Sequence, residues 1–518
     1  MKNAVGRDIP EEVMEETGKD VFRGTYYYNE NEYRTAPVKK RCRIGGSGTK
    51  LINSIQEALI NCNAHDGMTI SFHHHFREGD LVAMQVMNAI HEMGYKDITI
   101  CATSLGKAQD DLVPMIEDGT VTHIETSGIR GKIGEAVTDG KLKGVAILRS
   151  HGGRVRAIET GETKIDIAFI GAPSSDEYGN CRANGGNSNC GVLSYSAIDA
   201  EYAEQVVVLT DCLVPFPNFP ADISMTDVDY VVKLDSIGDP EKIATGAAKP
   251  VTDMRKLLMA KYCADFITST SYFKDGFSLQ TGVGGAPIAT ANMLAEKMKE
   301  QNIHMSFGAG GMSKPMCDLL DQGLVSCLLD TQDFDIDSIN NLINNPKHFS
   351  ITTKEYADPF CKGAVVNKLD FVILGTLEVD VNFNCNVVVS SEGALMGAQG
   401  GHPDTAAGAK CTIVITPLMQ GRIPTVRSRV TAITTPGDDI DAVVTDYGIA
   451  INPKRADLLE CAQKANLPLK MMEELKDIAY SIGGEPAGIK CEDRVVAVIE
   501  ARDGSIMDVV RKRKPLSI

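Results

Sequence analysis

Hydrophobic and polar positions along the chain follow two alternating spacings, one typical of buried strands and one typical of helices. A short apolar run at 68–72 (MTISF) leads into a polar loop at 73–80, then into apolar residues at helical spacing over 81–94 and a second apolar run at 97–104. The same order of strand, loop, helix and strand returns over 277–307. Strands that alternate with helices in this way predict an α/β fold whose sheets are mainly parallel and covered by helices.

A longer internal repeat relates the two halves of the chain. Residues 165–180 (IDIAFIGAPSSDEYGN) align without a gap on residues 369–384 (LDFVILGTLEVDVNFN), 204 positions later. The alignment pairs Asp166 with Asp370, Gly171 with Gly375, Asp176 with Asp380 and Asn180 with Asn384. Short polar side chains at such a spacing commonly hold a turn together, and we favour that role for Asp176 and Asn180 over substrate binding.

A period of this length is too long for a solenoid repeat and indicates two α/β domains in tandem. We place an N-terminal extension at 1–45, where no periodicity is found, and expect it to pack on the body. The N-terminal domain then covers 46–248 and the C-terminal domain covers 249–518, with the join near 243–251. In such sheets, ligands bind beyond the carboxyl ends of the strands.

The composition narrows the classes of function. The 518 residues carry a net charge of −17, and no basic stripe offsets it, which argues against a nucleic-acid partner. No apolar run is long enough to span a membrane, and no export signal is found. The 14 cysteines form no CxxC pair, so we expect reduced, buried thiols, no zinc site and a cytoplasmic protein.

Two glycine-rich loops are candidates for ligand binding. One is the stretch 390–410 (SSEGALMGAQGGHPDTAAGAK), which runs into the strand pattern CTIVITP, and the other is 282–287 (GVGGAP), between a strand and a helix. Small residues let backbone N–H groups approach a ligand closely, and the start of a helix adds donors that favour an anion. Neither loop matches the GxGxxG or GxxxxGK[ST] pattern of nucleotide sites.

Taken together, these segments resemble the CoA-transferase fold, with its two halves fused in one chain. The first half carries Ala172, Asp176, Gly179 and Asn180 at the expected spacing, and the second carries GVGGAP and AQGGHPDTAAGAKCTIVITP. Nearly end to end, the chain is more specifically similar to the alpha subunits of citrate lyase. Four runs carry that likeness: GRDIP, SFHHHFREGD, DCLVPFPNFPADIS and SSEGALMGAQGGHPDTAAGAK.

The resemblance implies a transferase that places citrate on the thiol of an acyl carrier protein, or of CoA, in exchange for acetate. It implies beta and gamma subunits as partners, the gamma subunit being the acyl carrier protein, and citrate, acetate and acetyl-CoA as small-molecule partners. No cofactor bound covalently to this chain is expected, because the phosphopantetheine-type thioester belongs to the carrier. We also expect an oligomer.

The exchange itself suggests roles for the glycine loops. Backbone donors stabilise a tetrahedral oxyanion by about 3–4 kcal/mol each, and positioning two reactants together removes much of the entropic barrier. We therefore assign binding of the thioester or CoA to a set of small residues: Gly282, Gly284, Gly285, Ala286, Gly308, Gly310, Gly400 and Gly401.

Many CoA-transferases use a glutamate nucleophile on the strand after the GVGGAP-like loop, and this chain departs from that pattern. The corresponding residues 302–316 (NIHMSFGAGGMSKPM) contain no Asp or Glu. We therefore expect a ternary complex in which citrate attacks the acetyl thioester to give a mixed anhydride, with no glutamyl-enzyme intermediate. Ser306, Glu392 and His402 are the catalytic candidates, although Ser306 has no base nearby in the sequence and Glu392 lies far along the chain.

The loop at 73–80 supplies candidates for holding citrate. His73, His74, His75 and Arg77 can form charge-assisted bonds to carboxylates. A metal bound by the three histidines is not expected, because adjacent strand residues point to opposite faces. Three alternatives stay open: a different hydroxy acid such as citramalate, a sugar-phosphate isomerase, and a non-catalytic effector-binding domain.

Overall fold

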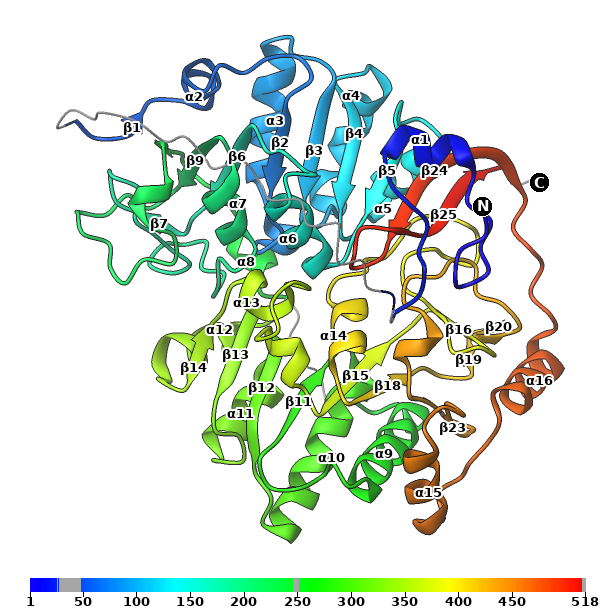
Figure 1. The fold of residues 1–518 in the computed structure, drawn as a ribbon. Coiled ribbons are helices and arrows are strands. Elements are labelled where there is room, and N and C mark those ends of the chain that lie inside the picture. The colour runs from blue at the N-terminus through cyan, green and yellow to red at the C-terminus, as the bar shows by residue number, and fades with distance from the viewer. Residues whose placement is uncertain (26, 28–47, 246–250, 283, 515–518) are drawn as a thin grey trace.

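Two large sheets form the body of the protein. The computed structural model describes residues 1–25, 27, 48–245, 251–282 and 284–514. In Figure 1 one sheet, with its helices, lies above the other, and the first and last segments of the chain both belong to the upper part. The predicted α/β architecture, with mainly parallel sheets covered by helices, is confirmed.

The first sheet has ten strands. In spatial order they are β1 (Leu51–Ile52), β10 (Tyr230–Lys233), β9 (Gln205–Thr210), β6 (Ile167–Gly171), β2 (Thr69–Phe72), β3 (Ile98–Ala102), β4 (Val121–Thr126), β5 (Ala146–Leu148), β24 (Cys491–Glu500) and β25 (Ile506–Arg513). Neighbouring strands run parallel except for the last pair, β24 with β25.

The second sheet has eight strands. In spatial order they are β14 (His348–Ser350), β13 (Leu328–Asp333), β12 (Met305–Met312), β11 (Phe277–Thr281), β15 (Phe371–Gly375), β18 (Cys411–Ile415), β22 (Ala442–Thr445) and β23 (Gly448–Ile451). On the central strand β15, Phe371 and Ile373 belong to one core cluster, and Val372 and Leu374 belong to another. Both faces of the strand are therefore buried, which explains its unbroken apolar sequence.

Helices connect most of the strands, and two of them fall within the ranges 81–94 and 277–307 where the apolar spacing predicts a helix. In the first half they are α2 (Ile55–Asn61), α3 (Val82–Glu92), α4 (Val113–Glu117), α5 (Gly131–Thr138), α6 (His151–Glu159), α7 (Ser196–Tyr202) and α8 (Pro240–Ile243). In the second half they are α9 (Met254–Ser269), α10 (Gly285–Gln301), α11 (Lys314–Asp321), α12 (Ile336–Asn344), α13 (Thr353–Ala357), α14 (His402–Gly408), α15 (Ala456–Lys464) and α16 (Met472–Gly483). On α3, for example, Val82, Val86, Met87 and Ile90 recur at helical spacing and are buried.

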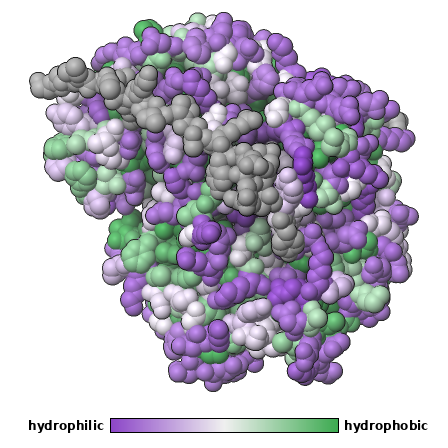
Figure 2. All heavy atoms as spheres, viewed as in Figure 1, coloured by the Kyte–Doolittle hydropathy of each residue, from purple (hydrophilic) through white to green (hydrophobic). Residues whose placement is uncertain are grey.

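The face of the molecule drawn in Figure 2 is mostly polar. Figure 2 shows hydrophilic side chains over most of the face seen in Figure 1. Of the helices in the described residues, none combines the length and the apolar character that crossing a bilayer requires.

The internal repeat is a repeat of structure. Strands β6 and β15 occupy the same positions in the alignment, and each is followed by a small antiparallel pair: β7 (Ser174–Ser175) with β8 (Cys181–Arg182), and β16 (Glu378–Asp380) with β17 (Cys385–Asn386). The Asp176 carboxylate accepts hydrogen bonds from the backbone N–H groups of Tyr178 at 3.0 Å and Asn180 at 3.1 Å. Asp380 accepts from Asn382 and Asn384 at the same two distances. The turn-holding role predicted for Asp176 and Asn180 is confirmed. The remaining short strands are β19 (Met419–Gln420), β20 (Ile423–Pro424) and β21 (Val426–Arg427).

One predicted domain boundary is wrong. The hairpin of β24 and β25, residues 491–513, adds to the first sheet beside β5, so the C-terminal domain does not continue to residue 518. The hairpin covers the β5 edge, which would otherwise expose unpaired backbone groups. The join predicted near 243–251 falls largely on residues 246–250, which lie outside the described residues, as do residues 515–518.

The N-terminal segment packs on this hairpin, as expected for an extension that belongs to the body. The helix α1 (Glu11–Thr17) contributes Val13 to a small core with Ile9, Val21, Val498 and Ile506. The backbone of Val21 pairs with that of Ile506. The rest of the predicted extension, residues 26 and 28–45, lies outside the described residues.

Candidate active site

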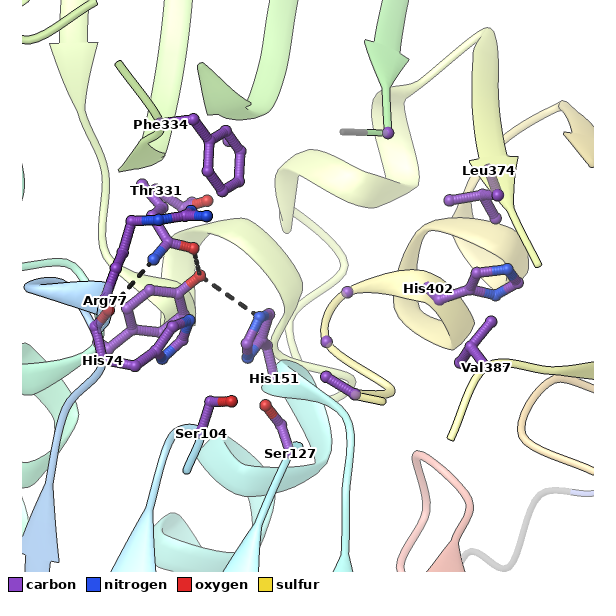
Figure 3. A pocket seen from close by; sticks show the side chains of 18 of the residues that line it. His74, Arg77, Ser104, Ser127, His151, Thr331, Phe334, Leu374, Val387 and His402 are labelled. Carbon is purple, nitrogen blue, oxygen red and sulfur yellow. Dashed lines mark hydrogen bonds between the residues drawn. The ribbon is translucent and has the colours of Figure 1, made fainter. Parts of the chain in front are cut away.

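A cavity of about 520 Å³ lies between the two halves. Its walls come from the carboxyl ends of strands in both sheets, which is where α/β sheets bind ligands. Figure 3 shows polar side chains from both halves around it, with His74, Arg77 and His151 on one side and His402 on the other.

The first half lines the cavity with residues that directly follow its strands. His74 and Arg77 follow β2, Ser104 follows β3, and Ser127 and Arg130 follow β4. Arg77 has a left-handed backbone with φ 54°, and its N–H donates to the His74 carbonyl at 2.9 Å. This tight turn aims the guanidinium into the cavity, and such uncommon conformations occur often at functional sites.

Two arginines give the cavity its positive charge. Within the part of the chain that the structure describes, neither Arg77 nor Arg130 forms an ion pair with a carboxylate. The guanidinium carbon of Arg77 lies 4.7 Å from the centroid of the Phe334 ring. Burial, reinforced by the nearby Arg130, lowers the pKa of Arg77, although a guanidinium remains charged at neutral pH. Unpaired guanidinium groups of this kind suit an anion with several carboxylates.

The histidines of the cavity are neutral. The ring centroid of His74 is 4.5 Å from that of Tyr195, and Tyr195 Oη lies 3.3 Å from His151 Nε2. Burial, then the neighbouring His151, Arg77 and Arg130, lowers the pKa of His74 well below its usual value. Burial and Arg154 lower the pKa of His151 to about 3. Neutral rings cannot form the charge-assisted bonds predicted for the histidines, whereas Arg77 keeps its charge.

The second half contributes mainly backbone and amide groups. Gly400 and Gly401 line the cavity, and within the described chain their N–H groups donate no hydrogen bond. Gly400 has a φ of 52°, a conformation that favours glycine. The N–H of Gly282, by contrast, donates to the Ile373 carbonyl at 2.7 Å. Gly282 therefore shapes the wall but offers no free donor.

The segment that carries Gly400 and Gly401 is fixed to the first half. The His151 N–H donates to the Gly400 carbonyl at 2.9 Å. At the start of α14, Asp404 accepts from Ser150 Oγ and from the Gly152 N–H, both at 2.9 Å. Because these bonds cross between the halves, the two free N–H groups are held in place before a ligand arrives.

Six residues predicted from the sequence line the cavity: His74, Arg77, Gly282, Gly400, Gly401 and His402. His402 Nδ1 lies 2.7 Å from Thr435 Oγ1, and burial lowers the pKa of its ring to about 4. The loop after β2 and Gly282, directly after β11, thus line the same cavity.

His73 and His75 do not line the cavity, which corrects their assignment to citrate binding. His73 Nε2 lies 2.9 Å from Asp199 Oδ2, and His75 Nε2 lies 2.9 Å from the Gly171 carbonyl. Both rings point into the first half because successive residues that leave a strand alternate in direction.

The structure also separates Ser306 and Glu392 from the cavity, which corrects both catalytic candidates. Ser306 lies near the start of β12, where its Oγ donates to the Phe277 carbonyl at 3.2 Å. Glu392 is exposed, and its charge acts on Arg513 of β25.

The other small residues assigned to the thioester also lie outside the lining: Gly284, Gly285, Ala286, Gly308 and Gly310. The first three open α10, whereas Gly308 and Gly310 are inside β12. A Cβ at Gly308 would lie 2.5 Å from Met316 Cε, and one at Gly310 would lie 2.6 Å from Gln280 Cδ. These two glycines serve packing, and the neighbouring Gly311 lines the cavity instead.

Sequence reasoning missed several cavity residues, among them Arg130, His151, Tyr195, Gln280 and Gln332. Arg130 and His151 each lie a few residues after a buried strand. Polar residues in that position are a usable signal, because the carboxyl ends of parallel strands share one edge. Tyr195 has no such signal, since it lies in a long loop before α7.

The comparisons with known proteins identify the family of the chain. Residues 48–513 match the family model described as "Citrate lyase, alpha subunit (CitF)". The citrate lyase alpha chain of Haemophilus influenzae is 44% identical over 489 residues, which cover 94% of this chain and 98% of that one.

Solved structures extend the comparison. A Streptococcus mutans structure, described as the alpha subunit of citrate lyase in complex with citrate, is 47% identical, with a TM-score of 0.96 over 99% of this chain and 100% of that one. The 4-hydroxybutyrate CoA-transferase of Porphyromonas gingivalis, at 17% identity and a TM-score of 0.52 over 82% of this chain and 96% of that one, shares the fold alone. This chain therefore belongs to the citrate lyase alpha-subunit family.

Proposed function

We propose that this chain exchanges acetate for citrate on the thioester of an acyl carrier protein, or of CoA, giving a citryl thioester and acetate. The observation that carries the proposal is the charge of the cavity: two arginines that line it, the half-buried Arg77 and the exposed Arg130, form no ion pair with a carboxylate among the described residues. Membership of the family and the citrate in the Streptococcus mutans structure support the choice of acid.

The proposed exchange takes place in a ternary complex. A citrate carboxylate, ionised at neutral pH, attacks the acetyl thioester carbonyl, and the thiolate leaves as a mixed anhydride forms. The thiolate then attacks the citryl carbonyl of the anhydride, and acetate leaves. Neither step needs a general base, so the protein has to orient the reactants and stabilise an oxyanion.

The residues of the cavity divide these tasks. Arg77 and Arg130 bind the carboxylates that do not react, because a guanidinium holds a carboxylate with two parallel hydrogen bonds. The free N–H groups of Gly400 and Gly401 face the same cavity and stabilise the oxyanion. Neutral His74 and His151 leave the positive charge concentrated on the arginines.

We further propose that no enzyme-bound acyl group forms. Among the described residues that line the cavity, Glu78 carries the one carboxylate, and its side chain is exposed. Glu78→Gln should retain exchange within about threefold, with Glu392→Gln as the control outside the cavity. Acetyl-CoA followed by borohydride should reduce no glutamate in the wild type. A reduced Glu78 would establish a covalent route.

The wider setting follows from the same proposal. We expect the chain to act in the cytoplasm with a beta subunit that cleaves the citryl thioester and a gamma subunit that carries the phosphopantetheine-type group. The test uses the purified chain with acetyl-CoA and citrate, citramalate or acetate, and mass spectrometry follows acyl exchange. Exchange with citrate above citramalate is expected. Loss of exchange with all three acids in a folded preparation would refute the transferase proposal.

A further inference from the structure

A second polar cluster lies inside the C-terminal half, next to the wall of the cavity. Asp330 and Asp333 belong to β13, and His348 begins the neighbouring strand β14. One ligand atom from each side chain lies within 4.8 Å of the other two. The three residues are 0%, 2% and 4% exposed, respectively. The exchange described above uses none of them.

A bulge in β13 brings the two carboxylates together. Residues three apart on a regular strand point to opposite faces. Here the pairing with β12 shifts, so that Gly310 pairs with Asp330 and Gly311 with Gln332. The extra residue, Thr331, returns Asp333 to the side of Asp330, as bulges beside active sites often do. His348 pairs with Leu328 and so shares the face of Asp330.

Among the residues that the structure places, no permanently charged basic side chain compensates the cluster. Within the described chain, no lysine or arginine pairs with Asp330 or Asp333, and the nearest basic group is His348 Nε2, 3.3 Å from Asp330 Oδ2. Among the described residues, and by distance and angle, Asp330 Oδ2, both Asp333 oxygens and His348 Nε2 are buried without a hydrogen bond. Two buried carboxylates with unused oxygens are costly unless a cation joins them.

We propose that Asp330, Asp333 and His348 bind one divalent transition-metal cation of the Zn²⁺ or Mn²⁺ class. Two carboxylate oxygens and one imidazole nitrogen form a donor set that these ions accept. His348 Nδ1 lies 3.0 Å from Asn341 Oδ1. An outer contact of this kind fixes the ring of a metal-bound histidine and leaves Nε2 for the cation.

The cation would hold one wall of the cavity in shape. Thr331 and Gln332 lie between the two aspartates, and Phe334 follows them; all three line the cavity. Gln332 Nε2 donates to the His74 carbonyl at 3.4 Å, across the two halves. On the outer side, a Cβ at Gly191 would overlap the Asp333 carboxylate, so this glycine lets a loop of the first half close over the cluster. The cation is structural and lies outside the space where the acids react.

Metal uptake by the full chain tests the site. The protein is stripped with EDTA, dialysed, and loaded with Zn²⁺ or Mn²⁺, and bound metal is measured by mass spectrometry of the elements. We expect about one equivalent per chain, and binding at least tenfold weaker in Asp333→Asn and in His348→Gln. The matched control is His304→Gln, which alters an exposed histidine 3.3 Å from Asp275 and should leave uptake unchanged.

A second measurement needs no variant and remains decisive if the substitutions prevent folding. Pulsed electron paramagnetic resonance of the Mn²⁺-loaded wild type should show the ¹⁴N coupling of one imidazole. Absence of stoichiometric uptake of either cation, uptake that both cluster variants leave unchanged, or a bound Mn²⁺ without nitrogen coupling would each overturn the assignment. None of these readouts depends on transferase activity, so the site and the proposed function can fail separately.

Discussion

The two halves of the chain share a framework and differ in the loops that face the cavity. Asp166 accepts from the Thr69 N–H at 2.7 Å, and its counterpart Asp370 accepts from the Ser278 N–H at 2.9 Å. These bonds tie β6 to β2 and β15 to β11 in the same way. After β2, however, the chain presents charged and aromatic side chains, whereas after β11 it presents glycines.

This difference shows what the fold requires and what the chemistry requires. The framework contacts use backbone donors and short carboxylates inside the sheets, so both halves keep them. The loops at the carboxyl ends of the strands do not form these framework contacts, so their sequences can differ between the halves. One half can therefore supply fixed positive charge for the acid, and the other can supply bare backbone for the thioester.

The largest effect on activity is expected from a side chain added to the glycine segment that the second half contributes to the cavity. In Gly401→Val the new Cβ would lie 2.6 Å from Tyr356 Oη, which accepts from Gln280 Nε2 at 2.7 Å. Crowding there displaces the N–H groups of the segment, so kcat should fall by about a hundredfold or more, as when an oxyanion donor is lost. Steady-state exchange assays measure kcat and KM. Gly488→Val is the control, since a Cβ at Gly488 meets nothing within 4 Å; equal losses in both variants would contradict the role of Gly401.

A smaller effect, confined to the KM for citrate, is expected from removing a charged side chain that the first half contributes to the cavity. Arg77→Ala removes a charged partner of the acid, worth about 1.5–3 kcal/mol, so KM for citrate should rise about ten- to a hundredfold. KM for acetyl-CoA should barely change. Arg422→Ala, an exposed arginine, is the control. If Arg77→Ala altered both KM values equally, the division between the halves would be wrong.

The framework was largely predictable because its signals are local. Apolar spacing identified β2, α3, β11 and α10, and the gapless repeat located β6 and β15. The positions of Arg77, Gly400 and Gly401 could also be predicted, because small or polar residues after buried strands face the ligand edge of an α/β sheet.

Long-range partners were not predictable. The alternating apolar residues around Asp503–Gly504 are typical of a hairpin, yet nothing local says that β24 and β25 return to the first sheet. Likewise, Tyr195 reaches the cavity from a loop, and Asp330 and Asp333 share a side only because of a bulge. Each depends on contacts between residues far apart in the chain.

Matched substitutions in the repeated turn compare the frameworks directly. Asp176 Oδ1 accepts from two backbone N–H groups, and Oδ2 accepts from Asn180 Nδ2 at 2.7 Å and the Asn218 N–H at 3.0 Å. In Asp176→Asn an amide nitrogen would face two hydrogen-bond donors, which should lower the free energy of unfolding by about 2–3 kcal/mol. In Asp380→Asn the free energy of unfolding should fall by less, because the hydrogen bonds to Asp380 Oδ2 are longer, at 3.2 and 3.4 Å.

The pKa values of the Asp176 and Asp380 carboxyls also predict a larger loss of stability for Asp176→Asn. Although burial opposes it, hydrogen bonds from Asn180, Asn218 and Tyr178 hold the pKa of Asp176 below its usual value. Burial raises the pKa of Asp380, so a neutral amide is the better substitute there. Urea midpoints at pH 7 measure both variants. A larger loss of stability for Asp380→Asn than for Asp176→Asn would show that the hydrogen-bond lengths do not determine how much each turn stabilises the fold.

The smallest effect concerns a histidine of the loop after β2. Burial, and then His73, lowers the pKa of His75 to about 3 in the folded protein, against about 6.5 in an unfolded chain. Below pH 6.5 the unfolded chain therefore binds a proton that the folded protein excludes, and stability falls as the pH falls from 6.5 towards 3. Lowering the pH from 7.5 to 5.5 should therefore reduce the free energy of unfolding by about 1.4 kcal/mol through His75 alone. Thermal unfolding of the wild type and of His75→Gln at both pH values isolates the difference: the wild type should lose more stability on acidification, while the exposed His65→Gln should follow the wild type. Parallel losses in the wild type and His75→Gln would mean that His75 is already protonated in the fold.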